Sequence, residues 1–166
     1  MTPESLIRRY RMEHHPEGGY FTETYRSTES VEKDALPERF GGSRQLSTAI
    51  YFLLVGDEYS SFHRISADEM WHFYAGQPLE VHMISPEGDY SIVTVGPDPE
   101  CGHSFQHVVP AGYWFASRCT SSNGYSFVGC TVAPGFDFED FELAKAEELV
   151  AEFPAHENII RAMCRR

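Results

Sequence analysis

The chain has 166 residues, the size of one domain with a buried core, and its composition is 42% apolar and 14% aromatic. This content excludes a disordered chain, and the formal net charge of −12 disfavours nucleic acids and anionic membranes as partners. No apolar run approaches the roughly 18–20 residues needed to cross a bilayer, and the N-terminus lacks a signal-peptide core. We therefore expect a single cytoplasmic domain over residues 1–166.

The first predicted element is a helix over residues 3–12, in the segment "TPESLIRRYRM". Thr2 or Ser5 is suited to cap this helix. The double glycine at 18–19 permits a sharp turn into a following strand, "YFTETYRS". Residues 29–44 are charged and carry proline and glycine, so they are predicted to form a long exposed loop.

Residues 47–134 contain eight or nine short runs that are rich in β-branched and aromatic residues, such as "STAIYFLL", "SSFHRI" and "EMWHFYAG". Turn sequences such as "SPEGD" and "SSNG" separate these runs at a spacing of about ten residues. The pattern predicts an all-β core over about residues 19–134, an antiparallel sandwich or barrel of the jelly-roll kind. Helical patterns over about residues 138–164 predict two flanking C-terminal helices.

Four cysteines are widely spaced and form no C-x-x-C pair: Cys101, Cys119, Cys130 and Cys164. This spacing favours reduced thiols over a zinc cluster or a disulfide framework. Reduced thiols agree with the expected cytoplasmic location.

The stretch "SSFHRISADEMWHFYAG" (60–76) concentrates the candidate chemistry. Strand alternation places His63 on one face of its first run, and Glu69 and Trp71 together on one face of its second run. A turn at "SAD" would make the two runs neighbouring antiparallel strands. We therefore predict that His63 and Glu69 meet across a hairpin, on a face that points into the interior.

Two motifs resemble those of the cupin superfamily. The first motif is carried here by Gly56, His63, Glu69 and Gly76, and the second by the Pro-x-Gly turn in "VPAGYWFAS" (109–117). Five ordered blocks are similar to those of an uncharacterised cupin family long known as a domain of unknown function: "HPEGGYFTETYRS", "TAIYFLL", "FHRISADEMWHFYAG", "VPAGYWFAS" and "GCTVAPGFDFEDFEL". The resemblance covers about residues 14–143 and implies a double-stranded β-helix barrel, assembled as a homodimer through a sheet edge.

The metal-binding cupin pattern implies three histidines and a glutamate around one metal. His63 and Glu69 stand at two of these positions, but Ile65 and Phe115 stand where the other two histidines are expected. Two protein ligands are too few for a tight site, and a third histidine would have to come from His82, His103 or His107. We expect no cofactor, with a divalent metal held weakly by His63 and Glu69 as the alternative.

Without a metal, His63 and Glu69 have the composition of a general-base pair. Some metal-free cupins that epimerise sugar nucleotides use a histidine base and a tyrosine acid, and this chain resembles them in fold without matching their signature residue by residue. We predict His63 as base, Glu69 as its orienting carboxylate and Tyr51 as acid, and the alternative is that His63 and Glu69 only bond one another inside an apolar barrel. The leading hypothesis is an isomerase or epimerase of a sugar-like carbonyl compound. The second is a non-catalytic module that binds a small ligand. The third is a metal-dependent oxygenase or hydrolase.

Further candidates for ligand contact are Glu17, Arg44, Trp71, Phe73, Trp114 and Phe115. Glu17 either projects from its turn into the barrel mouth or belongs to an ordinary turn, and Arg44 is the best basic candidate for an anionic ligand. The aromatic residues either stack on a ligand ring or belong to the core. On "TAIYFLL", either Tyr51 or its neighbours of opposite phase line the pocket, and His14 and His15 are expected at the surface.

Overall fold

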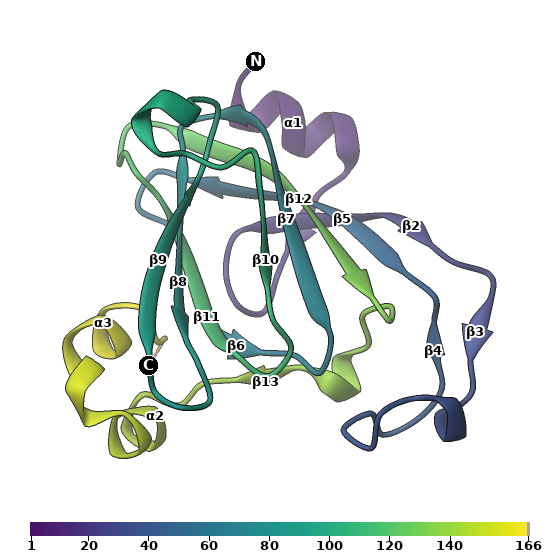
Figure 1. Cartoon of the computed structure of the whole chain (residues 1–166). Coiled ribbons are helices and arrows are strands. Elements are labelled where there is room, and N and C mark those ends of the chain that lie inside the picture. The colour runs from purple at the N-terminus through teal and green to yellow at the C-terminus, as the bar shows by residue number, and fades with distance from the viewer. Residues whose placement is uncertain (166) are drawn as a thin grey trace.

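Two antiparallel β-sheets face each other and close into a barrel in the computed structural model, which describes residues 1–165 (Figure 1). The first sheet has the order β1 (Glu13–His14), β2 (Tyr20–Arg26), β5 (Thr48–Val55), β12 (Tyr125–Ala133), β7 (Asp68–Gly76) and β10 (Gln106–Val109). The second has the order β13 (Glu142–Leu143), β6 (Tyr59–Arg64), β11 (Trp114–Cys119), β8 (Leu79–Ile84) and β9 (Tyr90–Val95). The predicted jelly-roll barrel with flanking helices is confirmed.

Alternation along the strands produces the core between the sheets. Phe52 of β5, Trp71 of β7 and Phe115 of β11 point inward and are buried with the other apolar side chains of the barrel. Their rings pack edge to face, with Trp71 lying 5.8 Å from Phe52 and 6.4 Å from Phe115 between ring centroids. The Trp71–Phe115 contact joins the two sheets, whereas the Trp71–Phe52 contact lies within the first sheet.

Helices cover the barrel at two places. Helix α1 (Pro3–Tyr10) starts with a capping box between Thr2 and Ser5 and buries Leu6 against β5 and β12. Helices α2 (Ala146–Glu152) and α3 (Glu157–Ala162) pack against the outer side of the second sheet. No helix in residues 1–165 is long and apolar enough to span a bilayer.

The predicted helix near residue 138 begins later than expected. Phe138–Asp140 form the short 3-10 helix η3, and Glu142–Leu143 form β13, which adds to the edge of the second sheet beside β6. The edge of β6 offers unpaired backbone groups there, and the chain satisfies them before it turns into α2. The short 3-10 segment η4 (Pro154–His156) then joins α2 to α3.

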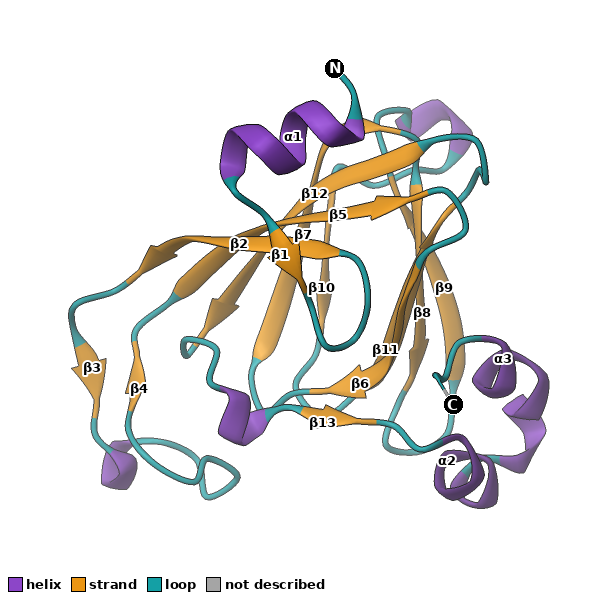
Figure 2. Ribbon diagram, turned by 180° about the vertical axis from the view of Figure 1, so that it is seen from behind, coloured by secondary structure: helices purple, strands orange, loops and turns teal. Residues whose placement is uncertain are grey.

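The segment 29–44 is anchored rather than a freely exposed loop. It contains β3 (Ser30–Val31), η1 (Lys33–Ala35) and the start of β4 (Arg44–Gln45), which form an arm on the side of the barrel away from α2 and α3 (Figure 2). Phe40 inserts its ring into the barrel core. The Arg44 side chain is also buried, so the prediction of an exposed loop is wrong for these residues.

The predicted hairpin between the runs of His63 and Glu69 is also wrong. Strand β6 belongs to the second sheet and β7 to the first, and residues 65–67 cross from one sheet to the other. His63 and Glu69 therefore belong to opposing sheets. Each side chain still points inward as predicted, because side chains alternate between the two faces within each strand whichever sheet the strand joins.

Candidate functional site

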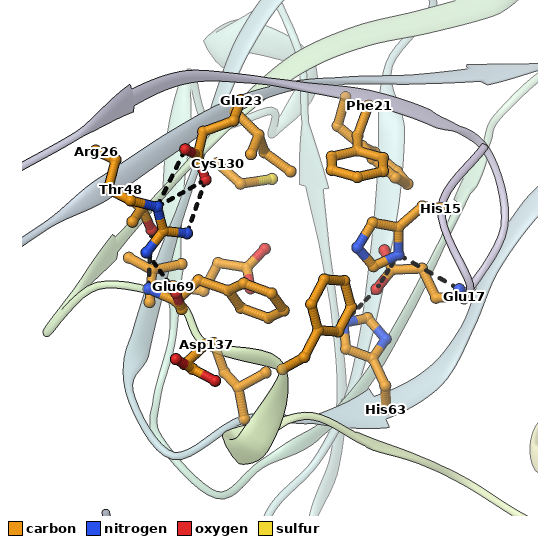
Figure 3. Close-up of a pocket in the computed structure, with 16 residues that line it drawn as sticks. His15, Glu17, Phe21, Glu23, Arg26, Thr48, His63, Glu69, Cys130 and Asp137 are labelled. Atoms are coloured by element: carbon orange, nitrogen blue, oxygen red, sulfur yellow. Dashed lines mark hydrogen bonds and ion pairs between the residues drawn. The ribbon is translucent and has the colours of Figure 1, made fainter. Parts of the chain in front are cut away.

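A cavity of ≈ 290 Å³ lies inside the barrel and carries most of its polar side chains on two opposite sides (Figure 3). Its apolar lining consists of Phe21, Ile50, Phe52, Ile65, Val132, Phe136 and Phe138. Its polar lining consists of His15, Glu17, Glu23, Arg26, Thr48, His63, Glu69, Cys130 and Asp137. An apolar cavity with a few converging polar groups is typical of a small-molecule site.

The loop between β1 and β2 brings Glu17 into the cavity. Gly18 and Gly19 have φ values of +118° and +73°, which L side chains rarely adopt. A Cβ on Gly18 would also collide with the backbone carbonyl of Tyr59. The double glycine therefore lets the loop lie against β6, where the Ser61 amide donates a 2.8 Å hydrogen bond to the Glu17 carbonyl.

Glu17, not Glu69, is the carboxyl partner of His63. Glu17 Oε2 lies 3.0 Å from His63 Nε2 and 3.3 Å from His15 Nδ1, and Ser60 donates a 2.8 Å hydrogen bond to Glu17 Oε1. His63 Nδ1 donates to the carbonyl of Ser61 at 2.7 Å, since a carbonyl oxygen only accepts. The Nε2 atom of the neutral ring therefore presents a lone pair to Glu17.

One proton shared between Glu17 and His63 satisfies this geometry. Burial raises the pKa of Glu17 well above its ordinary value, and the nearby Glu69 carboxyl raises it further. Burial lowers the pKa of His63 to about 3 and that of His15 to about 4. The arrangement favours a protonated carboxyl group beside two neutral imidazoles over a buried ion pair.

Glu69 lies on the opposing sheet and faces the cavity from β7. The residue Glu69 is only 8% exposed. Within residues 1–165 no basic side chain lies within ion-pair distance of its carboxyl group. Burial raises the pKa of Glu69 to about 7, although a hydrogen bond with Cys130 acts in the opposite direction. Glu69 thus changes its protonation state near neutral pH, as a general base requires.

Arg26 and Glu23, both on β2, form the polar group on the side of the cavity away from His63 (Figure 3). Arg26 Nε lies 3.1 Å from each Glu23 carboxylate oxygen, and Nη2 lies 2.7 Å from Oε2. The Nη1 atom donates to Gln45 Oε1 at 2.9 Å and to the Phe136 carbonyl at 3.2 Å. The guanidinium group is therefore bonded on both of its terminal nitrogens.

Other predicted site residues lie away from the cavity lining. Tyr51 points to the other face of β5, where its ring packs edge to face on Tyr10 at 4.8 Å, so it is not placed to act as an acid in the cavity. Arg44 is buried in an ion pair with Asp140 and is not placed to bind a ligand there. Alternation along β5 shows which of its residues share a face, but it does not show which of the two faces is covered by α1.

The four predicted aromatic ligand contacts are core residues. Trp71 and Phe73 pack in the barrel core and Trp114 packs beneath α2 and α3, so none of them lines the cavity. Phe115 is also buried, and its ring lies 4.0 Å from the His63 ring between centroids. Phe115 therefore supports His63 without facing a ligand.

Sequence reasoning missed His15, which lines the cavity instead of lying at the surface. The position of His15, two residues before Glu17 in the same glycine turn, could have indicated its place, because both side chains project from this turn into the cavity. Phe21 and Glu23 were also missed, although the alternation in "YFTETYRS" places them on one face. Arg26 is of opposite phase, and it reaches the cavity because the register between β2 and β5 shifts between Glu23 and Tyr25.

The donor atoms present do not fit the metal site of metal-binding cupins. The apolar side chain of Ile65 lines the cavity at one expected ligand position, and Phe115 occupies another. Across residues 1–165, no group of three His, Cys, Asp or Glu side chains is arranged to hold a metal ion. His82, His103 and His107 lie outside the cavity lining.

Replacing Glu69 with glutamine is expected to stabilise the protein at alkaline pH. Between the ordinary pKa of 4.5 and the folded-state pKa of about 7, the folded chain keeps a proton that the unfolded chain releases. Stability that Glu69 contributes at low pH is therefore lost as the pH rises through this window, by about 3 kcal/mol in total. Relative to the wild type, the Glu69→Gln variant should gain this amount between about pH 4 and pH 8.

Urea unfolding at both pH values measures the difference. Glu152→Gln, on the exposed surface of α2, is the control and is expected to change the free energy of unfolding by less than about 0.5 kcal/mol at either pH. An unchanged difference between Glu69→Gln and the wild type across the range would contradict the raised pKa of Glu69.

Comparisons with known proteins agree with this architecture. The sequence pattern of the family described as "Cupin superfamily (DUF985)" matches residues 4–144. An uncharacterised protein of Saccharomyces cerevisiae is 32% identical over 155 residues, which cover 87% of this chain and 76% of the yeast protein. A crystal structure of a protein from Shewanella oneidensis superposes with a TM-score of 0.89 at 41% identity, covering 99% of this chain and 98% of the other. A hypothetical protein from Leishmania major gives a TM-score of 0.89 at 35% identity, with both chains covered completely.

Proposed function

The chain belongs to the DUF985 family of the cupin superfamily, and from this premise we propose that its barrel binds a small polar, sugar-like carbonyl compound and isomerises or epimerises it without a metal. The observation that carries the proposal is the placement of two proton-carrying groups on opposite walls of one aromatic cavity. Glu69 is on β7, and Glu17 with His63 is on the β1–β2 loop and β6. A substrate between them has a base on one side and an acid on the other.

The proposed step begins at Glu69. Its carboxylate removes the proton from the carbon next to the substrate carbonyl, and the electron pair of the broken C–H bond forms the C=C bond of an enediol. The carbonyl oxygen takes the proton that Glu17 holds. As a proton returns to carbon, the Glu17 carboxylate takes back a hydroxyl proton from the enediol. Return of the proton from Glu69 to the former carbonyl carbon gives the isomer, whereas protonation of the original carbon from the other face by solvent, with Glu69 releasing its proton to solvent, gives the epimer. No oxidant or reductant is consumed.

His63 acts in this proposal as a positioning residue. Its Nδ1 is bonded to the Ser61 carbonyl and its Nε2 to Glu17, so no ring nitrogen is left to take a proton from the substrate directly. The Nε2 lone pair of His63 accepts a hydrogen bond from the protonated Glu17 carboxyl group and so fixes the orientation of that group in the cavity. This replaces the predicted role of His63 as the base that Glu69 orients.

A second candidate function is a non-catalytic ligand-binding module. The observation in its favour is that both oxygens of Glu17 have protein partners, namely His63, His15 and Ser60. A network whose members satisfy one another also serves to fix the loop against β6. The two functions differ in whether a bound carbonyl compound exchanges a carbon-bound proton with solvent.

Deuterium exchange followed by proton NMR tests the proposal. Purified protein is incubated in D₂O with a panel of aldoses, ketoses and amino sugars, and saturable binding is measured by calorimetry on the same panel. The proposal expects solvent deuterium beside the carbonyl group of the compounds that bind. Saturable binding without any exchange would overturn the enzymatic proposal in favour of the binding module.

A further inference from the structure

We propose that the ligand of the barrel cavity carries a positive charge, as a protonated amine or quaternary ammonium attached to a small apolar or sugar-like body. This inference rests on the proposed function, because both place the ligand in the same cavity, and it names the substrate class. An amino sugar satisfies both the charge inference and the proposed function, since it carries an ammonium group and a carbonyl carbon.

Acidic side chains outnumber basic ones in the cavity lining. Four carboxyl side chains reach the lining, those of Glu17, Glu23, Glu69 and Asp137, against the single guanidinium group of Arg26. The two histidines of the lining are neutral near pH 7, since burial lowers the pKa of each to about 4 or below. Glu17 is neutral when it holds its proton, and Glu23 is paired with Arg26. The negative charge left in the lining is therefore that of Asp137 and of Glu69 when Glu69 is ionised.

The single guanidinium group is already paired. Arg26 binds the Glu23 carboxylate through Nε and Nη2, and its Nη1 is bonded to the Gln45 side chain and the Phe136 carbonyl. An anionic ligand at Arg26 would have to displace Glu23 and would then face the carboxylate of Asp137 and, when it is ionised, that of Glu69 in the same lining. The cavity thus selects against phosphate and carboxylate ligands.

Glu69 supplies the matching attraction for a cation. Its carboxyl group is buried in the cavity, and among residues 1–165 it has no cationic partner within ion-pair distance. A buried carboxylate is costly unless a positive charge accompanies it. An ammonium group beside Glu69 would remove that cost, so ligand binding and the ionisation of Glu69 favour each other.

The aromatic lining supplies the second attraction. Phe21, Phe52, Phe136 and Phe138 present rings to the cavity, and none of these rings carries one of the cation–π contacts found within residues 1–165. Rings near a carboxylate are the recurring means by which proteins recognise substituted ammonium groups. Asp137 lies next to two of these phenylalanines and adds a carboxylate to the same lining.

Calorimetric titration with size-matched probes tests the inference. The probes are benzylamine, benzyl alcohol and benzoate, together with the corresponding cyclohexylmethyl amine, alcohol and cyclohexane carboxylate, at about pH 7.5, where the amines and acids are charged. The amines are expected to bind at least about tenfold more tightly than the alcohols, and the carboxylates more weakly than both. Glu69→Gln should lower the preference for amine over alcohol by about tenfold, whereas Glu152→Gln on α2 should retain it.

The outcomes separate the two proposals. Equal or tighter binding of the carboxylates, or an amine preference that Glu69→Gln leaves unchanged, would overturn the charge inference and leave the proposed proton transfer standing. Failure of all six probes to bind, together with failure of the whole carbonyl panel, would overturn both. Binding of amines without deuterium exchange in any compound of the carbonyl panel would support the charge inference and overturn the enzymatic proposal.

Discussion

Replacing Arg44 with alanine is expected to lower the free energy of unfolding by about 3–5 kcal/mol, measured by urea unfolding near pH 7. Arg44 Nε lies 2.7 Å from Asp140 Oδ2 and Nη2 lies 2.8 Å from Oδ1, so the pair is bidentate. The two side chains are only 2% and 7% exposed. Removing the guanidinium group leaves the Asp140 carboxylate buried without its partner, which is the costly way to break such a pair.

Two further variants keep this prediction specific. Arg118→Ala removes an ion pair with Glu80 of which the arginine side chain is 48% exposed, and it should cost less than about 1 kcal/mol. The double change Arg44→Met with Asp140→Leu should recover most of the stability lost in Arg44→Ala, since it leaves no unpaired buried charge. If Arg44→Ala were as stable as Arg118→Ala but lost ligand binding, the predicted ligand contact of Arg44 would stand and its structural role would not.

The barrel could be predicted from the sequence because its determinants are local. The alternation in "STAIYFLL" and "EMWHFYAG" records which side chains are buried, and the turn sequences between the runs record where each strand ends. The inward orientation of His63 and Glu69 follows from the same alternation, and both residues line the cavity. Faces can therefore be assigned one strand at a time.

The partner of His63 could not be predicted in this way, because it depends on contacts between distant segments. The three residues of "SAD" are short enough for a hairpin, yet the chain uses this region to cross between the sheets. Glu17 reaches His63 only because the double glycine lets the β1–β2 loop lie against β6. Strand alternation carries no information about which loop covers the end of a barrel.

The residues that were assigned wrongly share a physical cause. Tyr51 and Arg44 suit a ligand site by residue type, but the ring of Tyr51 and the guanidinium group of Arg44 contact protein segments that sequence spacing does not reveal. For Tyr51 the partner is helix α1, and for Arg44 it is η3, which lies about one hundred residues later in the chain. Residue type predicts that a polar group needs a partner, and the tertiary fold decides whether that partner is protein or ligand.

Replacing Glu69 with glutamine is expected to lower the rate of deuterium exchange into a bound carbonyl compound by about 10²–10⁴-fold, the usual contribution of a general base. The amide keeps the size of the side chain and has no basic oxygen. With an uncharged carbonyl compound as ligand, the wild-type exchange rate should rise as the pH passes through about 7, because Glu69 reacts only after it loses its proton. The measurement is the NMR exchange rate at saturating ligand from about pH 5 to pH 9.

The His63→Ala variant separates the base from the residue that positions the acid. Without His63, Glu17 keeps its hydrogen bond from Ser60 but loses the ring nitrogen 3.0 Å from Oε2, so the rate should fall while its rise near pH 7 persists. Glu69→Gln should instead abolish that rise. Because Glu69→Gln is expected to be more stable than the wild type above pH 7, unfolding would not explain its lost activity. Full activity in Glu69→Gln, with none in His63→Ala, would return the base to His63.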